Sequence, residues 1–427
     1  MARDTIFALS SGRPPAAISV IRISGPQAHD AGRRIAGDLP EARTASVRQL
    51  RQPDTKERLD DALVLRFDGP ASSTGEDIVE FQCHGGRAVV DSLLAALGTL
   101  DGLRLAEPGE FTRRAFENGR IDLTEAEGLA DLIEAETESQ RKAALALAEG
   151  GLRKQIEQWQ ERVLDLSARA ERAIDYADEG GPESDPELSS DCAELESELK
   201  GWLARPRIEP LKDGVRVVVA GPPNAGKSSL LNAIAGQERA IVTDLPGTTR
   251  DHIEVPLSLR GVPIVLTDTA GLRHALDQVE AIGVARSAAL IEAADVVVWL
   301  GEADAAPAHP RLIKVHSKAD LPERAVGPKG SIAVSAVSGQ GLTLLLARIA
   351  AQATSVLPAE DALALNRRQA GHIEEAAKSL AGAASVTDLV LVAEELRLAR
   401  SALDRLTGGA GVEDVLDALF SRFCLGK

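Results

Sequence analysis

Aromatic residues and cysteines are scarce in this sequence. Phe, Trp and Tyr make up 3% of the 427 residues, so the cores must be aliphatic and rich in alanine, a composition that favours helices. The three cysteines, Cys83, Cys192 and Cys424, lie far apart and have no metal-ligand spacing. This excludes a disulfide scaffold and predicts a reducing, cytoplasmic compartment.

Long apolar runs and an excess of positive charge are also missing. The chain has no apolar run of about 18 residues, and its first residues lack the apolar core of a signal peptide. We therefore expect no membrane span. The formal net charge of −17 argues against a broad electrostatic grip on nucleic acid. Any RNA contact must then use a local basic patch or a partner protein.

One segment, GPPNAGKS from Gly221 to Ser228, has the spacing of a P-loop. The β-branched run 215–220 before it predicts a buried strand, and 229–235 after it predicts a helix. In that context the loop N–H groups can surround a phosphate, Lys227 can reach the terminal phosphates, and the Ser228 hydroxyl can ligate magnesium. The flanking elements make a chance glycine loop the weaker interpretation.

Two further segments predict the phosphate side of a GTPase site. The first is DTAG at 268–271, which follows an apolar strand. Asp268 can hold magnesium through water, and the N–H of Gly271 can sense the γ-phosphate. The second is GTTRD at 247–251, where Thr249 can complete the magnesium coordination.

The base side is predicted from SKAD at 317–320 and from the pair Ser335–Ala336, each after a short apolar strand. Asp320 can accept two hydrogen bonds from the guanine edge that adenine cannot supply, and the 335–336 loop can contact the guanine carbonyl. Ser317 stands where the usual pattern has Asn, so we expect a lost or shortened tether to the P-loop and weaker affinity rather than lost guanine preference.

The residue after DTAG is Leu272, where Ras-like switches place a water-orienting Gln. Leucine cannot orient water. Two interpretations stay open: a slow GTPase that awaits an activator, or a downstream acid, for which Glu280 is the candidate.

Residues 1 to about 118 show a mixed α+β pattern, with strands expected at 18–25, 61–67 and 78–81 and a helix from about 88 to 100. Arg22 and Glu80 fall within strands, and local pattern alone favours a solvated strand face for both.

Helical periodicity begins near residue 121 and returns after the P-loop domain. Apolar residues step by three and four over 156–170 and again over 389–406. We expect the acidic segment that follows Pro182 and runs through Glu198 to be a solvated face and not a site. The simplest architecture packs the helices before and after the α/β unit together, so that the nucleotide domain is inserted into a helical domain.

The chain resembles the MnmE (TrmE) family of bacterial tRNA uridine-modification GTPases. The resemblance rests on VIRISG, TGEDIVEFQCHGG, PGEFTRRAFENGRIDLTEAEGLADLI, GPPNAGKSSLLNAI, IVTDLPGTTRD, DTAGLR and the terminal FCLGK. It implies an α+β folate-binding and dimerisation domain (1–118), a helical domain split in sequence (119–212 and 358–427) and an inserted Ras-like α/β G domain (213–357).

The resemblance also assigns roles by position. It implies folate contacts at Arg22, Glu80, Arg120 and Lys427, which reverses the local interpretation of the first two. It implies potassium ligands at Asn224, Thr243, Leu245 and Thr248, magnesium ligands at Ser228 and Thr249, and catalytic roles for Glu280 and Lys227. Cys424 is either catalytic or a small buried apolar residue. The full set of expected nucleotide contacts is Asn224, Ala225, Gly226, Lys227, Ser228, Ser229, Thr243, Asp244, Leu245, Gly247, Thr248, Thr249, Asp268, Thr269, Ala270, Gly271, Ser317, Lys318, Asp320, Ser335 and Ala336.

The implied activity is that of a dimeric, potassium-stimulated GTPase. With an FAD-containing MnmG-type partner, as a heterotetramer, it would add an aminomethyl or carboxymethylaminomethyl group to C5 of the wobble uridine, U34, of tRNA. The one-carbon unit would come from 5-formyl- or 5,10-methylene-tetrahydrofolate. Two alternatives remain: a ribosome-assembly GTPase, and a folate enzyme whose G domain is only regulatory.

Overall fold

The computed structural model describes residues 4–178, 185, 187–237, 239–240, 254–268, 288–324, 326–359, 362–409, 413–423 and 426. These divide into two compact units, each built from separate stretches of sequence. The first holds 1–130, 153–157 and 404–427, and the second holds 131–152 and 158–403. Within the described residues, no helix has the length and apolar character needed to cross a bilayer.

The first unit is built on a six-stranded sheet of order β3-β4-β5-β2-β1-β6. All neighbours are antiparallel except β1 and β6. The strands are β1 (Thr5–Leu9), β2 (Ile18–Ser24), β3 (Ser46–Arg51), β4 (Arg58–Phe67), β5 (Ile78–His84) and β6 (Leu103–Leu105). The expected strands are confirmed, with β4 and β5 each three residues longer than predicted.

Two helices, α1 (Ala28–Ala36) and α2 (Arg87–Gly98), bury one face of this sheet. Alternate strand residues such as Ile21, Ile23 and Phe81 enter their shared core. The sheet therefore has a dry side under the two helices, and the next residues along β2 and β5 point to the other side. Arg22 and Glu80 are among the latter.

The same unit contains α3 (Glu110–Glu117), the first turns of α4 (Leu123–Glu134) and α14 (Glu413–Phe420). Phe420 packs near Phe116, with ring centroids 6.5 Å apart. Gly109 adopts a positive φ of 71°, and a Cβ there would lie 2.3 Å from the Phe420 carbonyl oxygen. The end of α14 thus packs closely against the start of α3.

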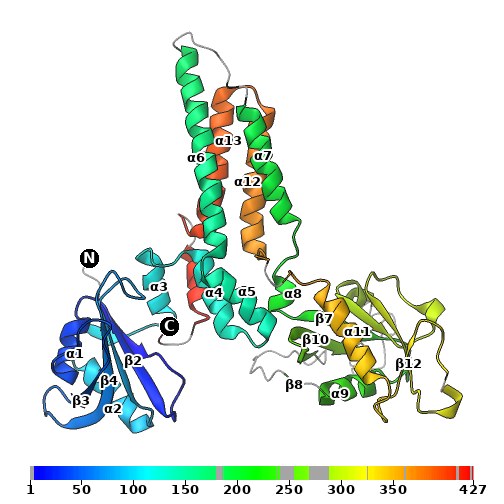
Figure 1. Ribbon diagram of the computed structural model, residues 1–427, viewed down its shortest axis with the longest axis horizontal. Coiled ribbons are helices and arrows are strands. Elements are labelled where there is room, and N and C mark those ends of the chain that lie inside the picture. The colour runs from blue at the N-terminus through cyan, green and yellow to red at the C-terminus, as the bar shows by residue number, and fades with distance from the viewer. Residues whose placement is uncertain are drawn as a thin grey trace, which may run out of the picture. The chain divides into compact units, whose positions relative to one another are not determined.

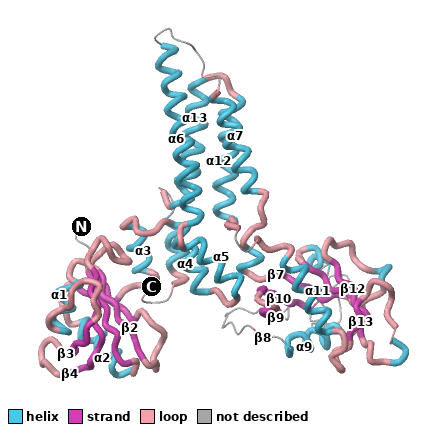
Figure 2. Tube along the Cα trace, viewed as in Figure 1, coloured by secondary structure: helices cyan, strands magenta, loops and turns pink. Residues whose placement is uncertain are grey.

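The second unit contains most of the length of the long helices, which Figure 2 shows as a bundle. These are α6 (Gly151–Asp178), α7 (Leu188–Leu203), α12 (Arg367–Ser385) and α13 (Leu389–Thr407), with the short helices α5 (Glu138–Ala148) and α8 (Glu209–Lys212) near their base. α7 packs along α12, and the Ser189 hydroxyl donates to the Ala384 carbonyl. Helices from either side of the α/β domain in sequence therefore pack together, as predicted.

The periodic residues of α6 are buried as expected: Ile156, Trp159, Val163, Leu166 and Ala170. The acidic segment through Glu198 is more than the solvated face that was expected. From Leu188 it forms α7, which buries Leu195 and Leu199, and the Glu198 carboxylate accepts a 2.8 Å hydrogen bond from the Trp159 indole. The acidic residues alone suggest an exposed segment, but the leucines at helical spacing form a buried face of the helix.

The remaining part of the second unit is an α/β domain with a seven-stranded sheet of order β13-β12-β11-β7-β10-β9-β8. The strands are β7 (Val215–Ala220), β8 (Arg239–Ala240), β9 (Glu254–Leu259), β10 (Val262–Asp268), β11 (Val296–Trp299), β12 (Leu312–Ser317) and β13 (Ile332–Val334). The five strands from β13 to β10 are parallel. Helices α9 (Lys227–Gln237) and α11 (Leu342–Thr354) pack against this sheet (Figure 1). The carboxyl ends of the parallel strands form one edge, where such sheets bind ligands.

Candidate functional site

The GPPNAGKS segment connects β7 to α9, as the P-loop prediction requires. Gly221 has a φ of 149°, and a Cβ there would lie 3.2 Å from the backbone of Leu300, so the close approach of two strand ends requires glycine. Asn224 has a φ of 60°, and Gly226 has a φ of 90°. These conformations curl the backbone so that α9 begins with its N–H groups at the loop.

Lys227 lies within this loop and is only 7% exposed. Its Nζ donates to the carbonyl oxygens of Gly221 and Pro222, at 3.0 and 2.9 Å. A buried ammonium held at the end of a parallel strand and at a helix N-terminus is suited to attract anionic phosphates. The predicted role of Lys227 therefore has the required placement.

Ser228 and Asp268 meet beside the loop. The Ser228 hydroxyl donates to Asp268 Oδ2 at 2.7 Å, and Asp268 is 1% exposed. A hydroxyl and a carboxylate, both hard oxygen donors, are the ligand types that magnesium prefers. The donor set at the ends of β10 and of the P-loop thus fits the expected magnesium site.

A pocket of about 250 Å³ adjoins the P-loop at the ends of β12 and β13. Its lining residues are Gly226, Ser229, Leu230, Ser317, Lys318, Asp320, Leu321, Val334, Ala336 and Val337. The predicted SKAD and Ser335–Ala336 loops therefore meet at one cavity. Sequence reasoning missed the apolar members, Leu230, Leu321 and Val337, because no motif marks the surfaces that sandwich a planar base.

Of the two outcomes expected at Ser317, a lost or a shortened tether to the P-loop, the structure has the shortened one. The Ser317 hydroxyl donates to the Ala225 carbonyl of the P-loop at 2.7 Å, so a short side chain still joins the two loops. Lys318 has a φ of 60°, and its Cε would lie 3.9 Å from a Cβ on Gly226, so its stem reaches over the P-loop. One hydrogen bond remains where an Asn amide could make more.

The 335–340 loop is held by Ser335, which is fully buried. Its hydroxyl accepts from the N–H groups of Val337 and Ser338, at 3.2 and 3.1 Å. Its own N–H donates to the Gln340 carbonyl. This serine therefore shapes the turn that presents Ala336 to the pocket.

Part of the predicted site lies outside the described residues. This holds for Thr243, Asp244, Leu245, Gly247, Thr248, Thr249, Thr269, Ala270, Gly271 and Glu280 of the G domain, and for Cys424 and Lys427 at the C-terminus.

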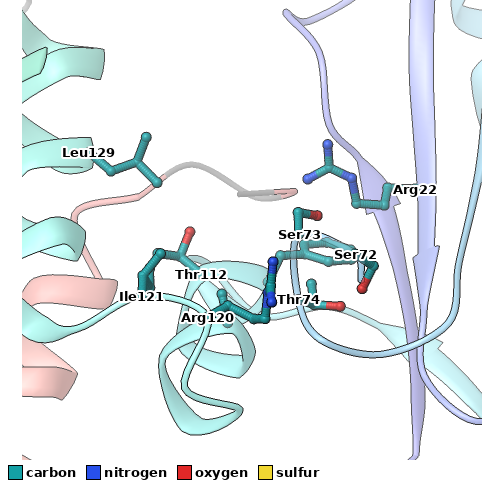
Figure 3. Close-up of a pocket in the computed structure, with 10 residues that line it drawn as sticks. Arg22, Ser72, Ser73, Thr74, Thr112, Arg120, Ile121 and Leu129 are labelled. Carbon is teal, nitrogen blue, oxygen red and sulfur yellow. The ribbon is translucent and has the colours of Figure 1, made fainter. Parts of the chain in front are cut away.

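A second pocket, of about 440 Å³, lies in the first unit (Figure 3). It is lined by Arg22, Ser72, Ser73, Thr74, Phe111, Thr112, Ala115, Arg120, Ile121 and Leu129. Its wall therefore combines two guanidinium groups and several hydroxyls with the apolar surface of α3 and α4. Ser72–Thr74, Phe111 and Thr112 were not predicted, since neither the hydroxyls of the 72–74 loop nor two residues at the start of α3 carry a distinctive signal.

Arg22 and Glu80 are cross-strand neighbours whose side chains form an ion pair of 2.8 Å. Their side chains are only 25% and 15% exposed, and Arg22 lies over the Phe111 ring at 5.6 Å. The local interpretation as a solvated strand face is therefore wrong. The two side chains are partly buried because α3, which comes much later in the chain, covers this face of the sheet.

Hydrogen bonds and an ion pair hold the loop that contributes Ser72–Thr74 to the second pocket. Thr74 Oγ1 and Ser24 Oγ are 2.7 Å apart, and the Ser24 hydroxyl donates to Glu76 at 2.8 Å. Glu76 in turn pairs with Arg114, which is 4% exposed. The Asn118 amide donates to the Thr74 carbonyl at 2.7 Å. Buried contacts of this kind hold one wall of the pocket rigid.

Comparison with known proteins covers the whole chain. A family profile described as the MnmE helical domain matches residues 123–424, and one described as the GTP-binding protein TrmE N-terminus matches residues 5–120. The chain belongs to the MnmE family. A protein of Rhizorhabdus wittichii named tRNA modification GTPase MnmE is 52% identical over 100% of this chain and 97% of its own length. The proteins of the same name from Novosphingobium aromaticivorans and Erythrobacter litoralis are 50% and 51% identical over 99% of this chain and all of theirs.

Among solved structures, the G domain of the T. maritima FeoB iron transporter is similar to 33% of this chain and 98% of its own, at 24% identity and a TM-score of 0.24. The MnmE assignment rests on the full-length relatives and on the two matched segments, which together span the sheet unit, the helices and the inserted domain.

Proposed function

We propose that this chain is a GTPase that acts in tRNA modification. One observation carries the proposal: the P-loop, Asp268, the 317–320 loop and the 335–336 loop all meet at the carboxyl edge of one parallel sheet. Each supplies a different part of guanine nucleotide recognition. The full-length relatives named tRNA modification GTPase agree with this assignment.

We also propose the partner, the modified position and the role of nucleotide hydrolysis. As a homodimer in the cytoplasm, and with an MnmG-type FAD protein in a heterotetramer, the chain modifies C5 of U34 in tRNA. Nucleotide hydrolysis drives a conformational step and does not transfer the carbon. The proposed domain limits are 1–118, 119–212, 213–357 and 358–427.

The pocket of the first unit is the proposed site for 5-formyl- or 5,10-methylene-tetrahydrofolate. Arg22 and Arg120 offer guanidinium groups suited to carboxylates, and Phe111 offers an apolar face suited to a flat ring. Glu80 holds the Arg22 guanidinium through its Nε, which leaves the fork of the group for a ligand to approach. We include Lys427 in this site, and assign no fixed role to Cys424.

Magnesium at the nucleotide site would be held by Ser228 and Thr249, and potassium by Asn224, Thr243, Leu245 and Thr248. A monovalent cation beside the phosphates supplies positive charge that stabilises the developing negative charge. Glu280 is proposed to position the hydrolytic water.

Potassium dependence tests the cation assignment. Steady-state GTP hydrolysis is measured in potassium and sodium chloride at matched ionic strength. We expect turnover to rise with potassium and far less with sodium, and Asn224→Ala to abolish the difference because the amide oxygen is removed. Equal wild-type rates in the two salts would contradict the potassium site and leave the GTPase assignment intact.

The function itself is tested by nucleoside analysis of tRNA from a strain that lacks this protein. We expect aminomethyl-type uridines to disappear at U34 and to return with the wild-type chain. Lys227→Ala should not restore them, whereas Lys200→Ala, a change on the exposed surface of α7, should. Unchanged modification in the deletion strain would contradict the proposal and favour a ribosome-assembly role.

A further inference from the structure

The loop that carries Lys318 and Asp320 is closed by a side chain outside every motif. Arg324, in the short helix η3 (Pro322–Arg324), donates from Nε to the Ser317 carbonyl oxygen at 2.9 Å. Its own carbonyl oxygen lies 2.9 Å from His316 Nε2, and its N–H donates to the Leu321 carbonyl. The segment from His316 to Arg324 is therefore a ring closed by two contacts from one residue.

Ser317 is held from two directions by this arrangement. Its hydroxyl donates to the Ala225 carbonyl of the P-loop, and its carbonyl accepts from Arg324. Ala319 is fixed as well, because its N–H donates to the Val334 carbonyl at 3.1 Å. Arg324 thus connects, through one residue, to the loop that would hold the phosphates.

The 317–320 loop needs support from Arg324 because it carries Asp320 and Lys318. Asp320 is exposed at the rim of the pocket, and Lys318 has the positive φ of 60° that non-glycine residues rarely adopt. Two parallel hydrogen bonds to a base edge tolerate little displacement of the carboxylate. Ser317 supplies a single side-chain hydrogen bond to the P-loop, so backbone support from elsewhere becomes more important.

We propose that Arg324 is a positioning residue for guanine recognition: its guanidinium holds the 317–320 loop in the shape in which Asp320 meets the base. This inference rests on the proposed function as a GTPase. Arg324 touches no nucleotide in this scheme. It acts on base selectivity through the Ser317 carbonyl, and it has no part in hydrolysis.

A matched control exists in the same domain. Arg311 is also partly buried and also donates from Nε to a backbone carbonyl, that of Asp295, at 2.8 Å. It precedes β12, whereas the 317–320 loop follows it, so Arg311 lies at the opposite edge of the parallel sheet. Arg311→Ala removes the same kind of bond without touching the pocket.

The experiment compares GTP with ITP, because inosine lacks the exocyclic amine that gives Asp320 its second hydrogen bond. Dissociation constants for both nucleotides, and thermal unfolding, are measured for wild type, Arg324→Ala, Arg324→Lys and Arg311→Ala. We expect Arg324→Ala to lower the GTP-over-ITP preference by about tenfold. Arg324→Lys, which retains one donor, should recover much of it, and Arg311→Ala should leave the preference unchanged even where its melting temperature falls.

Asp320→Ala provides a second measurement that does not depend on the size of the first effect. In an Asp320→Ala background, the change Arg324→Ala should have no further effect on the GTP-over-ITP ratio, since there is no carboxylate left to position. A wild-type ratio in Arg324→Ala, or an equal loss in Arg311→Ala, would overturn the inference. Failure of the wild-type protein to prefer GTP over ITP would instead overturn the guanine-nucleotide function on which it rests.

Discussion

At the scale of single residues, the nucleotide pocket separates two tasks. Ser317 joins the base-side loop to the P-loop through the Ala225 carbonyl, and Asp320 stands exposed at the pocket rim, where it can meet a base. The first contact is internal to the protein and the second is directed at the ligand. Base preference should therefore depend on Asp320 more directly than on Ser317.

Exchanging this carboxylate for an amide should change which base is bound. Asp320→Asn presents a donor where guanine also presents donors, so we expect the preference to move from guanine toward xanthine nucleotides, by about tenfold or more. Competition of GTP and XTP for the wild-type and variant proteins measures it. Binding of ATP as tightly as GTP by the wild-type protein would show that the assignment of guanine recognition is wrong.

A second residue-scale feature is the carboxylate of Glu110 in the first unit. It accepts hydrogen bonds from Arg104 at 2.6 and 2.8 Å, from Arg114 at 2.9 Å and from the Glu107 N–H at 2.8 Å. Burial by itself would raise the pKa of Glu110, but the hydrogen bonds from Arg104, Glu107 and Arg114 outweigh it and lower the pKa below the usual 4.5. The charged form is thus favoured in the folded protein.

This shift predicts how the stability contributed by Glu110 depends on pH. Because the folded pKa lies below the unfolded one, the contribution is complete above about pH 4.5 and is lost as the pH falls through the folded value. We expect Glu110→Gln to destabilise the first unit at neutral pH by about 2–3 kcal/mol, less than for a fully buried pair because Arg104 is partly exposed. Urea unfolding of both proteins from about pH 7 to about pH 3 checks it. A difference that stays constant or grows toward low pH would contradict the assignment.

At the scale of elements, helix α13 separates its apolar residues clearly by exposure. Val392, Leu396, Ala399, Leu403 and Leu406 are buried at three- and four-residue spacing, whereas Leu398 is 41% exposed. The buried positions form the core-facing stripe of an amphipathic helix. Packing of this stripe, more than intrinsic propensity, holds the helix in the bundle.

Two leucines of this helix therefore predict different costs for the same change. Leu396→Ala should lower the free energy of unfolding of the bundle by about 2–5 kcal/mol, because a fully buried side chain leaves a cavity. Leu398→Ala should cost about 0.5 kcal/mol or less. Urea unfolding followed by tryptophan fluorescence, with Trp159 and Trp202 in ring contact at 5.3 Å as reporters of the bundle, measures both. Equal costs would show that the exposure of the helix has been assigned incorrectly.

At the scale of the whole molecule, charge limits how tRNA can be held. The net charge is −17, and several arginines are paired with acids, as at Arg153 with Glu125 and Arg169 with Asp185 and Asp191. Paired arginines have little capacity to neutralise phosphates. A partner protein is therefore the expected source of most of the affinity for tRNA.

This predicts a clear difference between the chain alone and the assembled enzyme. At about 0.15 M salt, where charges beyond about 8 Å are screened, the purified chain should retain little tRNA on a filter. Addition of the proposed FAD-containing partner should raise retention by at least about tenfold. Tight binding of tRNA by the chain alone would contradict this prediction and would indicate that a local basic surface binds tRNA.

Much of the architecture follows from local sequence. The P-loop, DTAG and SKAD segments predicted the inserted α/β domain, because each directly follows an apolar strand in the sequence. The apolar periodicity at 156–170 and 389–406 predicted that helices on either side of that domain pack together. The segment through Glu198 shows the limit of such reasoning: its charges predicted a solvated face, yet the leucines between them make α7 a core helix.

Only the tertiary structure decided what lies around each site. Arg22 and Glu80 were assigned correctly to strands, but their burial comes from α3, some ninety residues after Arg22 in sequence. The sequence leaves open whether the tether at Ser317 is lost or shortened, and only the fold shows the contacts of Ser317 with Ala225 and Arg324. Sequence motifs identify the residues that contact a ligand, because those residues have fixed chemistry and spacing. The contacts that hold such groups in place come from distant segments, and many residue types can supply them, so they become visible only when the chain is folded.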